Sequence, residues 1–169
     1  STFVNSAEYQ GRLKESTQMG VENIGDASAA ADAEILSLTC ELLLAAGLEE
    51  FQVSVGEVDF FKALAEDSGL DENAVEEVRK LISNKNFFGV SELLDAAETS
   101  DAIKEAFVRL PQLFGGPEIL KEASLYAVNQ KAAKAVERLE DIHSIMRTRS
   151  LEKYISYDLG SLSKYNYYT

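Results

Sequence analysis

From Glu57 to about Thr148 this chain contains almost no pattern typical of β-strands. Clusters of turn residues divide the stretch into short segments that are typical of helices instead. The clusters are Ser68-Gly69, Asn84 to Gly89, Thr99-Ser100 and Pro111 to Pro117. Strand-like segments flank the stretch on both sides. We therefore expect an α+β chain in which a mostly helical insertion interrupts an antiparallel sheet.

Helix starts within this block are predicted from residues that favour the N-cap position. The expected caps are Asp71 for a helix over 72–82, Ser91 for 92–97 and Thr99 for 100–110, and Pro117 is expected at a first helical position. The last helix is expected over 120–147, with a break near Asn129. Its apolar residues recur at three-and-four spacing, which is more typical of a core face than of a partner-binding seam. They are Leu125, Val128, Ala132, Val136, Leu139, Ile142 and Met146.

Two further elements are predicted before the block. One is a helix between Ser28, a favourable N-cap, and Gly47, a favourable terminator. Apolar residues share one side of it: Ile35, Leu38, Leu42 and Ala46. Cys40 lies on an apolar side too, and a lone cysteine cannot form an internal disulfide, so we expect a buried and inert thiol. Residues 51–56 alternate between apolar and polar, which predicts a half-buried strand.

The run Gln18-Met19-Gly20-Val21-Glu22 predicts another strand, beside the one over 51–56. Its polar face would carry Gln18, Gly20 and Glu22, and its core face Met19 and Val21. A glycine between an amide and a carboxylate leaves room for a small ligand, with Glu22 suited to an ammonium group and Gln18 to a carboxylate or amide. The more common alternative for such a pattern is a solvated strand face without a ligand.

The chain is strongly acidic, with 16 Lys and Arg against 29 Asp and Glu and a formal net charge of −13. Nucleic-acid backbones bind clustered basic residues, often with stacking aromatics, and no segment combines the two. The densest basic segment, residues 131–149, is interrupted by acidic residues and is expected to be a solvated helix face. We therefore expect no nucleic-acid partner.

Membrane and metal sites are not indicated by the sequence. No apolar run approaches the roughly 20 residues of a membrane span, and no signal peptide is recognisable, so we expect a cytoplasmic protein without a membrane partner. His143 is the only histidine. Because no cysteine pair or second histidine accompanies it, we expect a structural or surface histidine, no metal site and no cofactor.

Several short motifs lie near the two ends of the chain. They are Gly11-Arg12-Leu13-Lys14-Glu15, Gln18-x-Gly20-x-Glu22, Ala31-Asp32-Ala33-Glu34, Asp158-Leu159 and Tyr167-Tyr168-Thr169. Together they resemble motifs of the histidyl-tRNA synthetase family, over nearly the whole chain. The resemblance implies a partial class II aminoacyl-tRNA synthetase-like domain, with core strands and a helix in 1–56, a helical insertion in 57–148 and return strands in 149–169. It also implies a histidine-like pocket, whose residues would be Gln18, Glu22, Tyr167, Tyr168 and Arg12.

The cationic groups that histidine activation with ATP requires are missing or weakened. The family's catalytic arginine, a few residues before the Tyr-Tyr pair, falls on Ser163, and Asn166 replaces an aspartate. Lys14 stands where an arginine would clamp phosphate, and lysine is a poor replacement at such a site. These departures resemble the noncatalytic branch of the family, the regulatory subunit of ATP phosphoribosyltransferase.

That branch implies a protein of histidine biosynthesis that assembles with the short-form catalytic subunit and is needed for its activity and for histidine feedback. It implies a homodimer within a hetero-oligomer, with histidine as the effector. Two alternatives stay open: an active histidyl-tRNA synthetase core, and a plain helical protein-interaction module. Because the chain begins in the strand-like Thr2-Phe3-Val4 without an initiator methionine and closes on Tyr-Tyr-Thr, we expect a piece of a longer protein.

Overall fold

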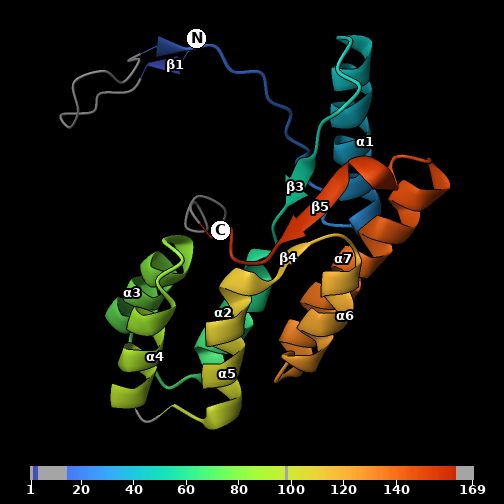
Figure 1. Ribbon diagram of the computed structural model, residues 1–169. Helices are drawn as coiled ribbons and strands as arrows, with labels where there is room; N and C mark the ends of the chain where they lie inside the picture. The colour runs from blue at the N-terminus through green and yellow to red at the C-terminus, as the bar shows by residue number, and fades with distance from the viewer. Residues whose placement is uncertain (1, 4–14, 98, 163–169) are drawn as a thin grey trace.

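The computed structural model of this chain describes residues 2–3, 15–97 and 99–162, which are mainly helical (Figure 1). The helices are α1 (Ala29–Ala45), α2 (Val58–Asp67), α3 (Glu72–Ser83), α4 (Phe87–Ala96), α5 (Asp101–Arg109), α6 (Glu118–Leu125) and α7 (Gln130–Thr148), with short 3₁₀ turns at Leu110–Gln112 and Glu152–Tyr154. The strands are β1 (Thr2–Phe3), β2 (Glu15–Ser16), β3 (Val53–Val55), β4 (Phe114–Gly115) and β5 (Ile155–Asp158). The predicted α+β class is confirmed.

Strands β3, β5 and β4 form one sheet with β5 in the centre. β5 runs parallel to β3, with Val53 opposite Ile155, and antiparallel to β4, with Phe114 opposite Asp158. This sheet is therefore mixed, not antiparallel throughout as expected. Since β3 precedes the helical block and β5 follows it, the chain returns to the same sheet after the block. β4 comes from inside the block, where the sequence indicated no strand.

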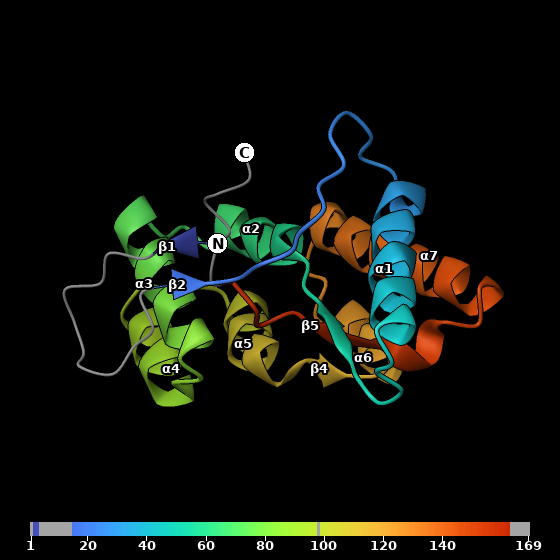
Figure 2. The ribbon, with the colours of Figure 1, turned by 90° about the horizontal axis from the view of Figure 1, so that it is seen from above.

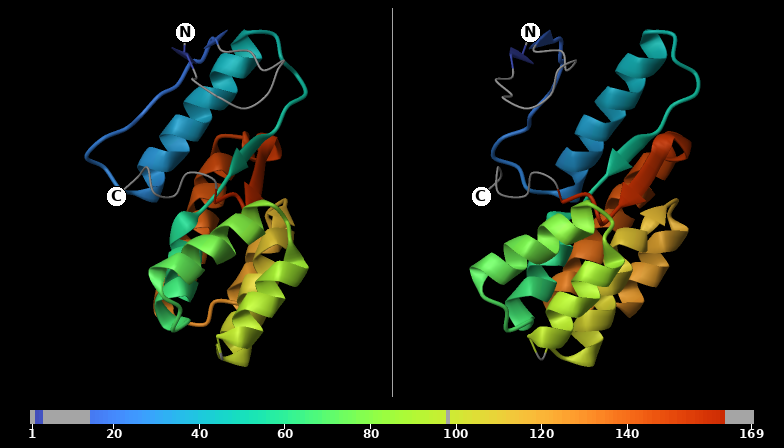
Figure 3. Two further views of the ribbon diagram at one scale, coloured as in Figure 1. Left: turned by 90° about the vertical axis from the view of Figure 1, so that its left-hand side faces the viewer. Right: turned by 60° about the vertical axis from the view of Figure 1, so that its left-hand side comes forward.

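The prediction of a strand over residues 18–22 is wrong. Residues 17–24 have no regular secondary structure and are exposed. A strand needs a neighbouring strand for its backbone hydrogen bonds. Strands β1 and β2 pair with each other before this segment, and no strand within the described ranges pairs with residues 18–22. The expected pairing of residues 51–56 with this segment is wrong too, since β3 pairs with β5. Figure 3 shows the segment as an irregular link from β2 to the start of α1.

Several helices begin where a side chain accepts a backbone hydrogen bond, as predicted. Ser28 caps α1 and Asp71 caps α3, each accepting from the N–H group three residues later. Asn129 does the same for α7 and separates it from α6, which confirms the expected break. These caps bind backbone donors that have no partner within the helix.

The predicted start of α4 at Ser91 is wrong. α4 begins at Phe87, because the Asn86 side chain accepts a hydrogen bond from the N–H of Gly89 at 3.0 Å. Ser91 lies inside the helix. Ser91 has a residue type that favours the cap position, but Asn86, five residues earlier, occupies that position in the structure.

Two other predicted starts are displaced by one residue. α5 begins after Ser100, not after Thr99, whose hydroxyl instead donates to the Ser68 carbonyl at 3.3 Å. Pro117 lies immediately before α6 instead of in its first helical position.

Helix α1 packs against α7 through small side chains. Ser37 and Cys40 are buried, and the Ser37 hydroxyl lies 3.5 Å from the Met146 sulfur. Small residues allow two helices to approach closely, so the bulkier Leu38 and Leu42 face outward with 39% and 44% of their surface exposed. The expected burial of the thiol is confirmed, and this burial raises the pKa of Cys40.

Helix α7 is the central helix of the packing, in contact with α1, α2 and α6 (Figure 2). Its predicted core stripe is confirmed within α7 itself, at Ala132, Val136, Leu139, Ile142 and Met146. Leu125 and Val128 precede the break and are exposed. Among the helices of the described ranges, none is both long and apolar enough to cross a membrane.

Candidate functional site

A cavity of about 960 Å³ lies between the segment before α1, the first turns of α1, the junction of β3 with α2, and α7. Its apolar part includes Ile35, Val55 and Ile142. Its polar part consists of charged side chains from all four of these elements: Glu22, Asp26, Asp32, Glu57, Asp59 and Arg138. The cavity lining thus combines apolar side chains with these six charged ones, which we call the rim.

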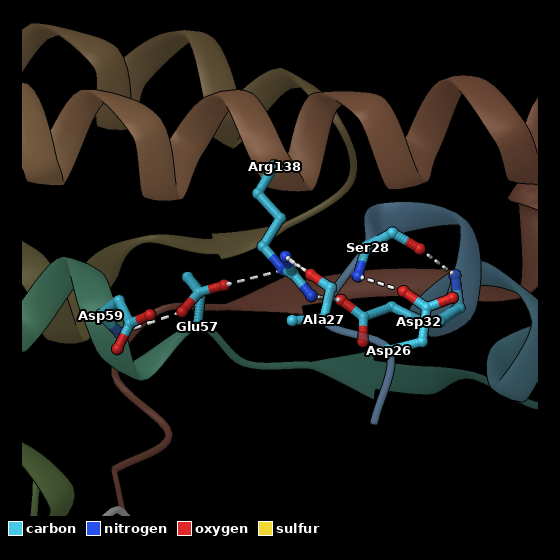
Figure 4. A network of polar contacts seen from close by, with 8 residues as sticks. Asp26, Ala27, Ser28, Asp32, Glu57, Asp59 and Arg138 are labelled. Atoms are coloured by element: carbon cyan, nitrogen blue, oxygen red, sulfur yellow. Dashed lines mark hydrogen bonds and ion pairs between the residues drawn. The ribbon is translucent and has the colours of Figure 1, made fainter. Parts of the chain in front are cut away.

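Arg138 connects the elements around this cavity (Figure 4). Its Nη1 donates to the Ala27 carbonyl at 2.6 Å, and its Nη2 donates to the Asp32 carboxylate. Its Nε lies 3.9 Å from Oε2 of Glu57. The planar guanidinium therefore contacts the segment before α1, the first turn of α1 and the residue before α2 at once, through donors held in a fixed fork that a lysine lacks.

Glu57 lies at the junction of β3 and α2, with only 12% of its side chain exposed. Its Oε1 accepts a hydrogen bond from the N–H of Asp59 at 2.9 Å and so caps α2. Burial raises the pKa of Glu57, and the hydrogen bond from Asp59 and the nearby charge of Arg138 only partly oppose this rise.

The turn that leads into α1 is held by its own side chains. The N–H of Ser28 donates to Oδ1 of Asp26 at 2.9 Å, while the Ser28 hydroxyl accepts from the N–H of Ala31 at 3.2 Å. The hydrogen bonds from Ser28 lower the pKa of Asp26. A negative charge at this helix start is favourable, because the N-terminus of a helix carries partial positive charge.

The charges on the cavity rim determine which ligands it suits. Five carboxylates face one arginine among the described lining residues. Such a rim attracts an ammonium or imidazolium group and repels a triphosphate. The cavity can therefore hold a small cationic ligand with an apolar body.

Only one of the five predicted pocket residues is placed at this cavity by the structure. Glu22 lies on the rim of the cavity, whereas Gln18 is exposed and is not among its lining residues. Arg12, Tyr167 and Tyr168 lie outside the described residues.

Glu57 and Arg138 were missed by sequence reasoning. Arg138 falls in the basic segment that was expected to be a solvated helix face, and its neighbours Lys134 and Glu137 do lie exposed. The available signal for Glu57 was its position directly after a strand-terminating glycine, Gly56, where a helix start needs an acceptor. No comparable local signal distinguishes Arg138, because its partners lie far away in the sequence.

His143 makes a structural contact. Its Nδ1 lies 3.1 Å from the hydroxyl of Tyr157, a fully buried side chain of β5. Desolvation raises the pKa of Tyr157 to about 12. The expected structural role of His143 is consistent with this contact, and the described part of the chain contains no group of three or more potential metal ligands.

Comparison with known proteins shows the family of this chain. The family model described as histidyl-tRNA synthetase matches residues 1–169. The chain belongs to the histidyl-tRNA synthetase family. Its relatives include the ATP phosphoribosyltransferase regulatory subunit of Acetivibrio thermocellus, which is 40% identical over 159 residues that cover 94% of this chain and 38% of the relative. The protein of the same description from Ruminiclostridium cellulolyticum is 38% identical, with the same coverage of 94% and 38%.

A solved structure of the histidyl-tRNA synthetase family has the same fold. It is described as an ATP phosphoribosyltransferase regulatory subunit/histidyl-tRNA synthetase from Bacillus halodurans C, and it superimposes with a TM-score of 0.76 at 28% identity. The match covers 86% of this chain and 38% of that one. This chain thus spans about two fifths of the length of the relatives it matches.

Proposed function

We propose that this chain is part of a noncatalytic regulatory subunit of ATP phosphoribosyltransferase. The observation that carries the proposal is the description of its relatives: proteins that match 94% of the chain at 38–40% identity are ATP phosphoribosyltransferase regulatory subunits. The proposal places the chain in histidine biosynthesis, in the cytoplasm.

The sequence supports the noncatalytic branch independently. Ser163 stands where the family's catalytic arginine is expected, and residues 150–169 contain no arginine. Transfer of a nucleotide needs cationic groups fixed at the phosphates. The acidic rim of the cavity also disfavours a triphosphate, and among its described lining residues only Arg138 is cationic.

The proposed effector is histidine, which has an amino group and an imidazole for the acidic rim. We retain Gln18, Glu22, Tyr167, Tyr168 and Arg12 as the proposed pocket residues. The position of Glu22 on the cavity rim supports its inclusion. Gln18 is retained on the resemblance alone.

The proposed assembly is a homodimer of the parent protein within a hetero-oligomer that contains the short-form catalytic subunit. The proposed domain layout keeps residues 57–148 as a helical insertion between core segments 1–56 and 149–169. The parallel pairing of β3 with β5 supports this layout, because it joins the two core segments directly across the block.

The test is a phosphoribosyltransferase assay of the short catalytic subunit from the same organism, with and without the full-length parent of this chain. We expect activity only with the parent present, and suppression of that activity by added histidine. Activity of the catalytic subunit alone, unaffected by the parent, would refute the proposal.

An active histidyl-tRNA synthetase core is the second candidate, and the description of the matching family model favours it. Histidine-dependent ATP–pyrophosphate exchange and tRNA charging by the same full-length parent separate the two. The regulatory proposal predicts neither activity.

A further inference from the structure

Two arginines of the helical block each donate to a main-chain carbonyl outside the block. Arg138 of α7 donates through Nη1 to the carbonyl of Ala27 at 2.6 Å. Ala27 ends the irregular segment that contains Glu22 and lies directly before the cap of α1. The same guanidinium binds Asp32 through Nη2, so two contacts fix its direction.

Arg79 of α3 makes the corresponding contact at the other end of the chain. Its Nη1 donates to the Leu162 carbonyl at 2.9 Å. Its Nε and Nη2 donate to the two carboxylate oxygens of Glu76 at 2.7 Å and 2.6 Å, and only 14% of its side chain is exposed. Leu162 is buried and precedes the stretch of sequence that carries Tyr167 and Tyr168.

A hydrogen bond to a carbonyl restrains the main chain itself, whereas an ion pair between two side chains leaves the main chain free to move. Both contacts are charge-assisted, and each arginine is oriented by a carboxylate. The two restrained segments also line the same cavity, to which Ala27 contributes from one segment and Ser161, next to Leu162, from the other. The arginines thus act on two parts of the lining of one cavity.

We propose that Arg138 and Arg79 are positioning residues, through which the helical block sets the main-chain positions of the two segments that flank it. The consequence for ligand binding rests on the proposed function: the block then controls histidine affinity through the positions of these two segments, in addition to the side chains, such as Arg138 and Ile142, that it contributes to the cavity lining. A change in the orientation of α7 or α3 is then transmitted to these segments through the hydrogen bond from Arg138 to the Ala27 carbonyl or from Arg79 to the Leu162 carbonyl.

The first experiment measures amide hydrogen exchange in the full-length parent, independently of any ligand. Arg138→Ala should accelerate exchange at the start of α1, at the hydrogen-bonded amides of Ser28, Ala31 and Asp32. Arg79→Ala should accelerate exchange in residues 155–162, and in both variants the rest of the protein should keep its protection. The matched controls are Lys134→Ala on α7 and Glu77→Ala on α3, two exposed residues whose truncation should leave both segments unchanged. Unchanged exchange in the arginine variants, or acceleration throughout the protein, would overturn the proposal.

The second experiment measures histidine affinity of the same proteins by calorimetry. Each arginine-to-alanine variant should weaken binding about tenfold, a loss within the range expected for residues that act through others. Arg138→Lys and Arg79→Lys keep the charge but lose the planar fork, so they should give intermediate affinities and remain folded.

The two experiments separate failure of the inference from failure of the proposed function. Wild-type protein that binds no histidine, together with local acceleration of exchange in the variants, would refute the effector assignment and support the positioning role. Wild-type protein that binds histidine, together with unchanged affinity in both alanine variants, would refute the control of binding by the block.

Discussion

At the scale of single residues, three features of its surroundings act on the carboxylate of Glu57. It caps α2, it lies near Arg138, and it is largely removed from water. The cap and the cation favour the charged form, while burial disfavours it, and burial has the larger effect on its pKa. The carboxylate is therefore retained at an energetic cost when it is ionised.

This balance predicts a pH dependence of stability. Because the folded state raises the pKa of Glu57 above its usual 4.5, the folded chain holds this proton more tightly than the unfolded chain. Stability from this group is fully present below the usual value and falls as pH rises towards the raised one. In Glu57→Gln the cap acceptor remains but the titration is lost, so the unfolding free energy of wild type minus that of the variant should decrease with rising pH. Urea unfolding of both proteins over a pH series measures this difference, and a constant or increasing difference would contradict it.

Cys40 gives a second prediction at this scale. Its side chain is fully buried and burial raises the pKa of its thiol, so the reactive thiolate is both rare and inaccessible. We expect no reaction with a charged thiol reagent at mildly alkaline pH in the folded chain, and complete reaction in denaturant. Labelling of the folded chain at the rate of a free thiol would show that α1 opens away from α7.

At the scale of elements, two serines allow a direct comparison of a cap with a helix interior. Ser28→Ala removes the acceptor for the Ala31 N–H and should lower the unfolding free energy by about 1 kcal/mol. Ser91→Ala, inside α4, should change it by no more than about 0.5 kcal/mol, in either direction. Urea unfolding measures both changes. Equal losses in the two variants would mean that Ser91 has a capping role after all.

Sequence reasoning located helices well because their signals are local. The caps at Ser28 and Asp71 and the break near Asn129 depend on residues within one turn, and the stripe of α7 depends on its own periodicity. Residues 18–22 show the limit of this approach. Alternation predicts which faces a strand would have, but a strand also needs a neighbouring strand, and that neighbour cannot be read from the segment itself.

At the scale of the whole molecule, the parts that sequence reasoning missed are the long-range ones. The pairing of β3 with β5 and the contact of Arg138 with Ala27 each join residues more than a hundred positions apart. Neither leaves a periodic pattern. The candidate site was therefore predicted at Glu22, whose residue type and motif are local, and not at Glu57 or Arg138, which become significant only after the helices pack.

The burial of Phe107 in the helical block predicts how much this side chain contributes to the free energy of unfolding. Phe107 of α5 is fully buried, and its ring packs edge to face against that of Phe61 of α2, with the two ring centroids 5.6 Å apart. Phe107→Ala should lower the unfolding free energy by about 3–5 kcal/mol, because it removes a large ring and leaves a cavity. Phe88→Ala is the matched control, since Phe88 is exposed, and should cost no more than about 0.5 kcal/mol. Denaturant unfolding of both variants measures these losses, and similar values would contradict the observed burial.

The strand order β3-β5-β4 has a consequence for protein engineering. The helical block supplies β4, which covers one side of the central strand. Deleting residues 57–148 and closing the gap with a linker would therefore strip hydrogen-bond partners from β5 and expose a bare edge to other chains. A chimera that exchanges the block between two members of the family has to bring a replacement for β4 with it. The block is thus interchangeable only together with the sheet edge that it completes.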